Sequence, residues 1–352
     1  MKKGIINKIK FRINRHIDKK LPLTWSHSKF LSAFYYFALS RSFYREFQAA
    51  LSGKAKYITD DKEKGNYFLL VRNTHRIEKG LLMKPRRATF ATEYITETVD
   101  AFEKVVKNAA AEDNQQLKWF NDVLTEYFDK NEPHKIVDQQ RVRFAKCSGE
   151  LNGSVNTDCK FIPYHRRVDS FAKIDFEEFY KFAKQRRSVR WFLDKKVPRE
   201  LIDKAVLAAN QSPSACNRQP FEYRIIDDPE LVKKAVHLPM GTGGYAHSIP
   251  VMVVVVGNLD AYFSERDRHV IYVDASLANM AFMFALETLG LSSCSINWPD
   301  IEDREIAMEK FLKLGKHQRP IMCMGIGYPD PDGMVAYSEK RPLDQIRKYN
   351  FE

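Results

Sequence analysis

Residues 250–257 read PVMVVVVG, an apolar run in which valine and methionine stand between a proline and a glycine. A run of this length that is rich in β-branched side chains predicts a strand with both faces buried. Working outward, strand-like and helix-like segments alternate along the C-terminal half: strands at 221–227, 293–297 and 320–328, and helices at 175–185, 198–210, 229–238, 270–290 and 302–314. This alternation predicts a layered α/β or α+β domain.

Three glycines precede the central strand, at Gly241, Gly243 and Gly244. The dinucleotide-binding fingerprint needs GxGxxG after a strand, where the turn leads into a helix. Here the glycines stand before the strand and their spacing differs. The sequence therefore argues against a Rossmann nucleotide site.

Positive charge is concentrated at the N-terminus. Of 57 Lys and Arg and 45 Asp and Glu residues, residues 1–56 hold 13 basic and two acidic groups, which leaves the rest of the chain close to neutral. A neutral body with a basic arm argues against a nucleic-acid partner and favours one local electrostatic role.

Residues 1–56 are expected to form a basic, aromatic-rich helical arm. Apolar residues recur at every fourth position from Ile5 to Leu21, with Lys and Arg opposite them. Pro22 is expected to close or kink this helix, and a second helix to run to about Leu51. The pattern fits a helix lying on the anionic inner face of a membrane through residues 1–20, and it fits equally a helix docked on its own protein.

No uninterrupted apolar core occurs in residues 1–20, so we expect neither a signal peptide nor a membrane-spanning segment there. The five cysteines are scattered without a CxxC pair, and the nine histidines form no ligand motif. This usage predicts reduced thiols, a cytoplasmic protein and no metal site.

A mainly helical region is expected over residues 57–172, with one long helical segment from about 91 to 130 and a linker or functional loop over 136–172. Within it, RNTHRIEKGLLM (residues 72–83) is dense in polar side chains. On a helix, such a set either contacts an anionic ligand or forms a salt-bridged surface that ends near Gly80, and the second interpretation is the commoner one. The ligand-contact candidates are Arg72, His75, Arg76 and Lys79.

Two polar clusters stand out in the C-terminal half. RRSVR, residues 186–190, offers guanidinium groups and a hydroxyl, which suit a phosphate or another small oxyanion. SPSACNRQPF, residues 212–221, places donors and acceptors between two prolines, which suits the polar edge of a planar heterocycle. RRSVR alone is more commonly an ordinary solvated turn, whereas the density of amide side chains between the two prolines of the second segment favours a functional role over simple turn chemistry.

Taken in order, RRSVR, SPSACNRQP, SIPVMVVVV, the apolar segment DASLANMAFMFALETLGLSSCSIN, PIMCMGIGYP and KRPLDQI resemble the flavin-dependent nitroreductase family over about residues 176–350. The resemblance implies an α+β fold with a central, mostly antiparallel sheet flanked by helices, assembled as a homodimer around FMN. The domain would cover residues 173–352, after the mainly helical N-terminal region.

The resemblance also implies the residues that bind FMN. Arg186, Arg187, Ser188 and Arg190 of one subunit would hold its phosphate and ring, with Lys340 and Arg341 completing the phosphate site. Five residues of the 212–221 segment would reach across from the partner chain: Pro213, Ser214, Ala215, Asn217 and Gln219. A third segment, formed by Ile296, Asn297 and Trp298, would lie against the flavin ring. The family often has a small residue where Trp298 falls.

The implied activity is an FMN-dependent oxidoreductase that takes hydride from NAD(P)H and passes it to a small-molecule acceptor in a ping-pong cycle. The alternative is a non-catalytic, flavin-fold binding or scaffold protein whose N-terminal extension occupies the substrate side.

Overall fold

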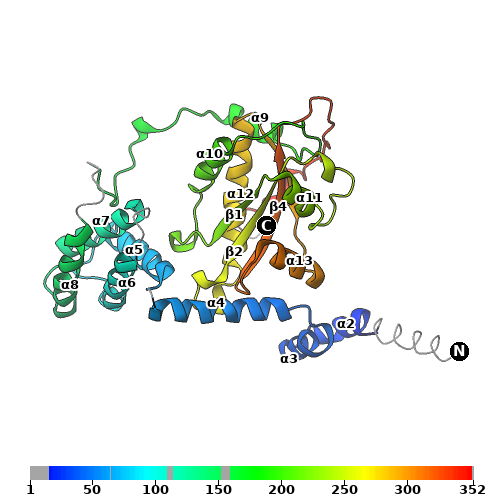
Figure 1. The fold of residues 1–352 in the computed structure, drawn as a ribbon. Coiled ribbons are helices and arrows are strands. Elements are labelled where there is room, and N and C mark those ends of the chain that lie inside the picture. Colours follow the sequence, from blue (N-terminus) through cyan, green and yellow to red (C-terminus); the bar gives the residue numbers. More distant parts are fainter. Residues whose placement is uncertain (1–15, 64, 109–113, 152–158, 351–352) are drawn as a thin grey trace.

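The computed structural model describes residues 16–63, 65–108, 114–151 and 159–350 (Figure 1). Its C-terminal half contains one sheet of four antiparallel strands in the order β1-β2-β4-β3. Their bounds are Phe221–Ile226 for β1, Val251–Asn258 for β2, Ser292–Asn297 for β3 and Gln318–Gly327 for β4. All four predicted strands are confirmed, and the sheet is the antiparallel one that the family resemblance implied.

Strand β2 lies inside the sheet and is buried on both faces, as its composition predicts. Because side chains alternate along a strand, Met252 and Val254 join the core on one face, with helices α11 (Pro229–Ala235) and α13 (Glu302–Leu312). Val253 and Val255 join the core on the other face, with α10 (Arg199–Ala209) and α12 (Val270–Thr288). Every residue from Val251 to Gly257 is buried.

Helices flank both faces of this sheet, α10 and α12 on one and α11 and α13 on the other. Helix α9 (Phe176–Gln185) packs on α12 through aromatic rings, and a short α14 (Leu343–Ile346) lies near the C-terminus. Short 3-10 turns connect them: η2 (Val168–Ser170), η3 (Ala215–Asn217), η4 (Ala246–Ser248), η5 (Leu259–Ala261) and η6 (Glu265–Asp267). The five predicted helices of this half are confirmed, each within a few residues.

One helical stretch in the described chain, Glu265–Thr288, is long and apolar enough to cross a membrane. It contains α12, whose Ala278, Phe282 and Leu286 are fully buried in the core on one sheet face. Packing in the domain core therefore accounts for one face of the helix, whereas Val273, Leu277 and Met280 of the same helix are exposed.

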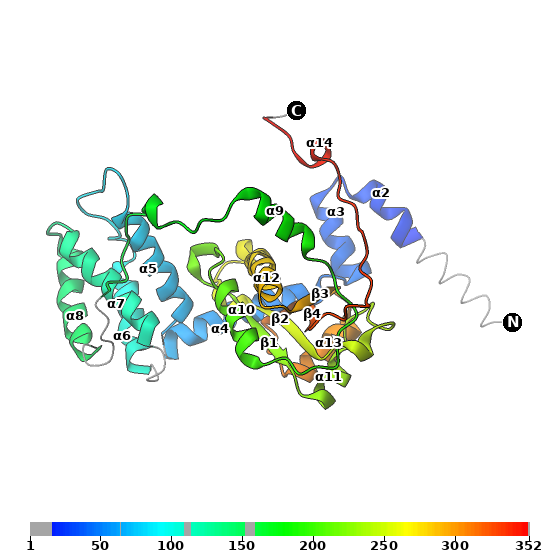
Figure 2. The same cartoon turned by 90° about the horizontal axis from the view of Figure 1, so that it is seen from above.

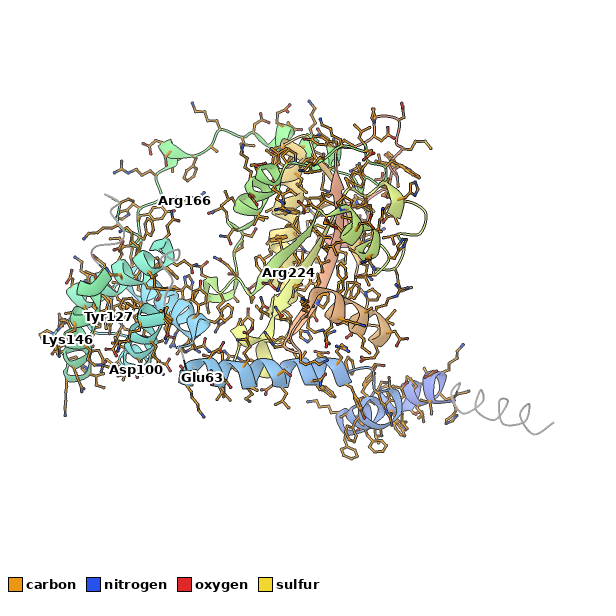
Figure 3. The ribbon with its side chains drawn as sticks, viewed as in Figure 1. Glu63, Asp100, Tyr127, Lys146, Arg166 and Arg224 are labelled. Atoms are coloured by element: carbon orange, nitrogen blue, oxygen red, sulfur yellow. The ribbon has the colours of Figure 1, made fainter. Side chains whose placement is uncertain are left out.

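The helical region before the sheet has its own core (Figures 1 and 2). Its helices are α5 (Tyr67–Leu81), α6 (Ile95–Asn108), α7 (Asn114–Lys130) and α8 (Lys135–Leu151). Tyr127, labelled in Figure 3, is fully buried in this core and donates a 2.8 Å hydrogen bond to the Phe90 carbonyl.

Within the long helical segment expected over 91–130, the structure contains α6 and α7, and residues 109–113 lie outside the described residues. One expectation for this region is wrong. Residues 136–151, expected to belong to a linker or functional loop, lie in α8, whose Val137 and Phe144 are buried in the helical core. The mostly polar residues 148–158 follow directly, and they make the apolar spacing of α8 hard to recognise in the sequence. The connection to the sheet domain is therefore shorter than expected and includes Arg166 (Figure 3).

The arm is also more divided than predicted. It contains α2 (Leu21–Trp25), α3 (Lys29–Phe34), a π-helix η1 (Tyr35–Ser40) and α4 (Tyr44–Glu63). Pro22 lies in the first turn of α2, where proline is tolerated, and so begins a helix there. The second helix does not end near Leu51, and the expected boundary at residue 56 falls inside α4. Residues 1–15 of the predicted membrane segment lie outside the described residues.

Helix α4 joins the arm to the rest of the molecule, because it lies along the end of the sheet domain and leads into α5 (Figure 1). Its docked face carries Ala49, Gly53 and Tyr57, all buried. Arg45 at its start pairs with Glu302 at 2.7 Å and Glu309 at 2.9 Å, both on α13. A Cβ on Gly53 would lie 2.7 Å from the Leu259 backbone, so the close approach of α4 to η5 requires glycine.

We expect Gly53→Ala to lower the free energy of unfolding by about 1–3 kcal/mol, because α4 would be pushed off η5. An alanine replacing an interior helical glycine ordinarily stabilises by about 0.5–1 kcal/mol. Urea unfolding followed by circular dichroism measures the difference. The matched control is Gly149→Ala in α8, where a Cβ would meet nothing within 4 Å. A gain of stability in both variants would contradict the proposed packing of α4.

Candidate functional site

The arginine-rich segment lies against the edge strand β3. It follows α9, whose last turn is closed by the Arg186 N–H donating to the Phe182 carbonyl at 3.2 Å. Ser188 then forms a parallel bridge with Ser293, and the Val189 N–H donates to the Ser293 carbonyl at 3.0 Å. The backbone of the segment is therefore fixed by the sheet, while its side chains remain partly accessible.

Buried polar atoms without hydrogen-bond partners gather beside this segment. They are Nε of Arg186, the Ser293 hydroxyl and one carboxylate oxygen of Glu287. Burial raises the pKa of Glu287, and the nearby Arg186 guanidinium opposes that shift. Unpaired buried donors are costly. A guanidinium N–H and a hydroxyl are the donors that an oxyanion accepts from.

The other two arginines of the segment differ in exposure, since Arg187 is half-buried and Arg190 is exposed. Arg187 donates to the Arg186 carbonyl at 3.1 Å. The Arg190 side chain is exposed, with its guanidinium 5.8 Å from the centre of the Tyr245 ring, and its carbonyl accepts a 2.7 Å hydrogen bond from Ser248. The backbone at Arg190 is therefore held while its charged group stays available.

The second cluster forms a strained loop around η3. Cys216, Asn217 and Gln219 all have left-handed backbones, with φ of 55°, 55° and 50°. Left-handed conformations are costly for residues other than glycine and persist where the surroundings enforce them. The Ser214 hydroxyl accepts a hydrogen bond from the Gln219 N–H at 3.1 Å, and the Gln219 side-chain amide donates to that of Asn217 at 3.1 Å.

Asp274, near the N-terminal end of the apolar helix α12, supports this loop. Its carboxylate is buried and accepts a 2.9 Å hydrogen bond from the Ala215 N–H. The Tyr262 hydroxyl donates to the same oxygen at 3.5 Å. Burial raises the pKa of Asp274, and the hydrogen bond from Ala215 opposes the shift. Arg218, itself buried, stacks over the Tyr262 ring at 4.8 Å on the same side of the loop.

The remaining predicted cofactor residues lie in different surroundings. Ile296 is buried in the core and Asn297 is exposed at the end of β3. The Trp298 indole points into the core and donates a 2.7 Å hydrogen bond to Glu305, so its ring is unavailable to a ligand beside Asn297. Pro213 is exposed. Lys340 and Arg341 lie in an exposed tail that extends from the sheet domain toward α14 (Figure 2).

One copy of the chain does not bring the two clusters together. Ser188 pairs with Ser293, and the strand register places Ser293 level with Val251 at the start of β2. The η3 loop leads into Phe221, which pairs with Gly257 near the end of β2. Six residues of strand separate the two levels, which is roughly 20 Å. The clusters therefore lie at opposite ends of the sheet.

The four candidates on α5 are placed beside this loop, since α5 packs against η3 (Figure 1). Arg72 pairs with Glu97 at 3.0 Å, His75 with Glu78 at 3.3 Å, and the Arg76 guanidinium lies 3.6 Å from the centre of the Tyr94 ring. Lys79 is exposed. These partners belong to the helical region itself, and they favour the salt-bridged surface over ligand contact for the first three.

Sequence reasoning missed Asp274, Glu287 and Ser293. An acidic residue within an apolar helix such as VIYVDASLANM is a usable signal, because a buried carboxylate needs a partner. Nothing local marks Ser293 or Glu287, whose roles depend on the segment that pairs with β3.

Comparison with known proteins assigns the class of this domain. The Nitroreductase family model matches residues 183–241 and 239–328. A putative NADH dehydrogenase/NAD(P)H nitroreductase of Methanothermobacter thermautotrophicus is 27% identical over 157 residues, covering 45% of this chain and 80% of that protein. Iodotyrosine deiodinase 1 of Pongo abelii is 23% identical over 197 residues, covering 48% of this chain and 67% of its own length.

Among solved structures, an FMN-dependent nitroreductase from Clostridium difficile aligns with a TM-score of 0.42 and 24% identity, covering 48% of this chain and 98% of that one. The antiparallel sheet with helices on both faces defines an α+β domain. On the match to the family model, residues 183–328 are a nitroreductase-family domain, and a helical region precedes it.

We expect Asp274→Ala to loosen the η3 loop, because the Ala215 N–H loses its acceptor. Hydrogen–deuterium exchange should show the Ala215 amide exchanging at least about tenfold faster. Asp274→Asn keeps an acceptor oxygen and should retain most of the protection. Tyr262→Phe removes only the weaker 3.5 Å contact and serves as the control. Unchanged exchange at Ala215 in Asp274→Ala would show that the carboxylate does not hold the loop.

Proposed function

We propose that this protein is an FMN-dependent oxidoreductase that uses NAD(P)H to reduce a small-molecule acceptor. The observation that carries the proposal is the group of buried, unpaired donors at Arg186 and Ser293, within a domain of the nitroreductase family. FMN is the cofactor named for one structural relative, and NAD(P)H is named for one sequence relative.

The residues present fit a flavin mononucleotide. Arg186, Ser188 and Arg190 would hold its phosphate, because guanidinium forks and a hydroxyl match phosphate oxygens. Arg187 would contribute charge at the rim. Lys340 and Arg341, on the exposed tail, would add positive charge to this site. The buried Nε of Arg186 has no hydrogen-bond partner among the described residues, and such an anion would approach through the parts of this segment that reach solvent.

We propose that the functional unit is a homodimer, because within one chain its two clusters lie at levels about 20 Å apart along the strands and beside opposite edge strands of the sheet. In a twofold dimer, the arginine segment of one copy can meet the η3 loop of the other, and the symmetry makes two equivalent sites. Pro213, Ser214, Ala215, Asn217 and Gln219 would then offer backbone and amide groups to the flavin ring. Ile296 and Asn297 would flank the ring through backbone atoms and the exposed amide, with Trp298 acting only as a buried support.

Bound FMN would supply the hydride chemistry, by which NAD(P)H is oxidised before an acceptor is reduced at the same site. The protein's own part is to bind the cofactor, orient it and keep the loop rigid. The strained backbone at Cys216, Asn217 and Gln219, held by Asp274, provides that rigidity. No acid–base pair or nucleophile is needed for this role.

The two relatives have different names, nitroreductase and deiodinase, and these names imply different acceptors. We therefore propose NAD(P)H as the electron donor and specify the acceptor only as a small molecule. The helices around α5 border the η3 loop and would shape the acceptor side, with exposed Lys79 as the available cation and Arg72, His75 and Arg76 as secondary candidates. Free thiols at Cys216, Cys294 and Cys323 suit a cytoplasmic protein.

The purified full-length protein is expected to be yellow and to lose its flavin absorbance under NADH or NADPH without oxygen. Arg186→Ala combined with Arg190→Ala should weaken FMN binding by at least about 100-fold, because two charged contacts to phosphate are lost. Quenching of FMN fluorescence measures the affinity.

Arg199→Ala is the matched control for that pair of changes, since Arg199 is an exposed arginine paired with Asp227 at 2.6 Å, away from the site. FMN affinity unchanged by the double substitution would refute the assignment of the phosphate site. Bound flavin that NAD(P)H never reduces would favour the non-catalytic alternative.

A mixing experiment tests whether each site is shared between two chains. Arg186→Ala and Asn217→Gly damage different clusters, so each variant alone should bind little FMN. Co-expression of the two should restore about a quarter of the wild-type sites, because half of the dimers are mixed and each mixed dimer has one intact site. A site contained in a single chain predicts no restoration.

A further inference from the structure

The arm exposes large apolar side chains along its whole described length. From residue 16 to residue 48 the structure contains no buried residue, although this segment forms helices. The exposed large apolar residues between 16 and 51 are Leu23, Phe30, Phe34, Tyr36, Phe37, Leu39, Phe43, Tyr44, Phe47 and Leu51. Exposed fractions reach 76% at Phe30 and 62% at Phe37. So many exposed large apolar residues within one short segment are typical of an interaction site.

Helix α4 continues this surface on the side away from the sheet domain. Its docked face carries Ala49, Gly53 and Tyr57. At 100° per residue, Phe47, Leu51 and Ile58 fall on the opposite side of the helix, and all three are exposed. A helix that only joins two parts of one protein needs one apolar face. The packing within this protein therefore does not explain the apolar residues on the exposed side of α4.

Neighbouring aromatic rings contact one another along the arm. Tyr36 and Phe43 lie 4.4 Å apart between ring centres, and Phe43 lies 6.3 Å from Phe47. The rings therefore form a row that leads from the π-helix into α4. Figure 3 shows rings on the side of the arm that faces away from the sheet. We call the exposed apolar residues from Leu23 to Leu51, with Ile58, the aromatic face.

The charges beside the aromatic face are positive. Lys19, Lys20, Lys29 and Arg41 are exposed, and none of them forms an ion pair within the described part of the chain. The only acidic residues between 16 and 51 are Asp18 and Glu46, and Glu46 is paired with Arg268 at 3.2 Å. An occupant of this surface must therefore accept aromatic side chains and carry negative charge.

We propose that the aromatic face docks on the surface of an anionic lipid bilayer. Phe, Trp and Tyr are suited to the boundary between headgroups and acyl chains, and nearby Lys and Arg are attracted to anionic headgroups. A second copy of the arm fits less well, because the two basic surfaces would repel each other. The proposed membrane contact lies on residues 23–58, whereas the sequence suggested the basic stripe of residues 1–20. The ion pairs of Arg45 with α13 attach the arm to the sheet domain.

Co-sedimentation of the full-length protein with vesicles tests this inference. We expect binding to mixed phosphatidylcholine and phosphatidylglycerol vesicles, and much weaker binding to phosphatidylcholine alone or at high salt. The triple variant Phe30→Ser, Phe37→Ser, Phe47→Ser should bind anionic vesicles at least about tenfold more weakly, because three exposed rings are lost.

The matched control is Val142→Ser, Tyr164→Ser, Leu207→Ser, which removes three exposed apolar side chains outside the arm and should bind like the wild type. A blue shift in the emission of Trp25 on anionic vesicles, absent in Trp25→Phe, would support insertion of the arm.

Three results would overturn the proposal. The wild-type protein could fail to bind anionic vesicles, or the triple arm variant could bind them as tightly as the wild type. The third is that the arm variant changes the oligomeric state of the protein in analytical ultracentrifugation while vesicle binding stays the same, which would assign the face to a second copy. Far-ultraviolet circular dichroism confirms that each variant is folded.

Discussion

The burial of β2 on both faces is the constraint on which the rest of the structure depends. Its alternating side chains enter two separate cores, so helices must cover both sides of the sheet. The same strand sets the register of β1 and β4, and through β4 that of β3. Those pairings position both polar clusters, one level with Val251 and one level with Gly257. The placement of the site is thus a consequence of the apolar strand.

The polar clusters differ in how they are stabilised. The arginine segment is held by backbone pairing to β3 and leaves buried donors unpaired. The η3 loop is held by its own side chains and by Asp274, against the cost of three left-handed residues. Strain and unpaired donors are both unfavourable in an isolated chain, and both are explained if a bound anion and a second copy complete the site.

Helix α4 couples the two halves of the chain. Its small residues Ala49 and Gly53 allow close contact with η5, and Arg45 adds charge pairing with α13. The helical region therefore approaches the sheet domain from a fixed direction, and α5 contacts the η3 loop. The arm extends from the other end of α4. The aromatic face on the arm is therefore joined, through the docked helix α4, to the domain that contains the candidate site.

Local patterning determined the strands and helices of the C-terminal half, because strand and helix periodicities are short-range properties that survive in one sequence. It also determined that 186–190 and 212–221 are polar clusters. The helical state of α8 was missed, because polar residues interrupt its apolar spacing. Only the tertiary structure decided that the clusters lie at opposite ends of the sheet, that the Trp298 ring is buried, and that Asp274 supports a loop 59 positions away. These facts depend on strand register and on contacts between residues far apart in the chain, which no local pattern encodes.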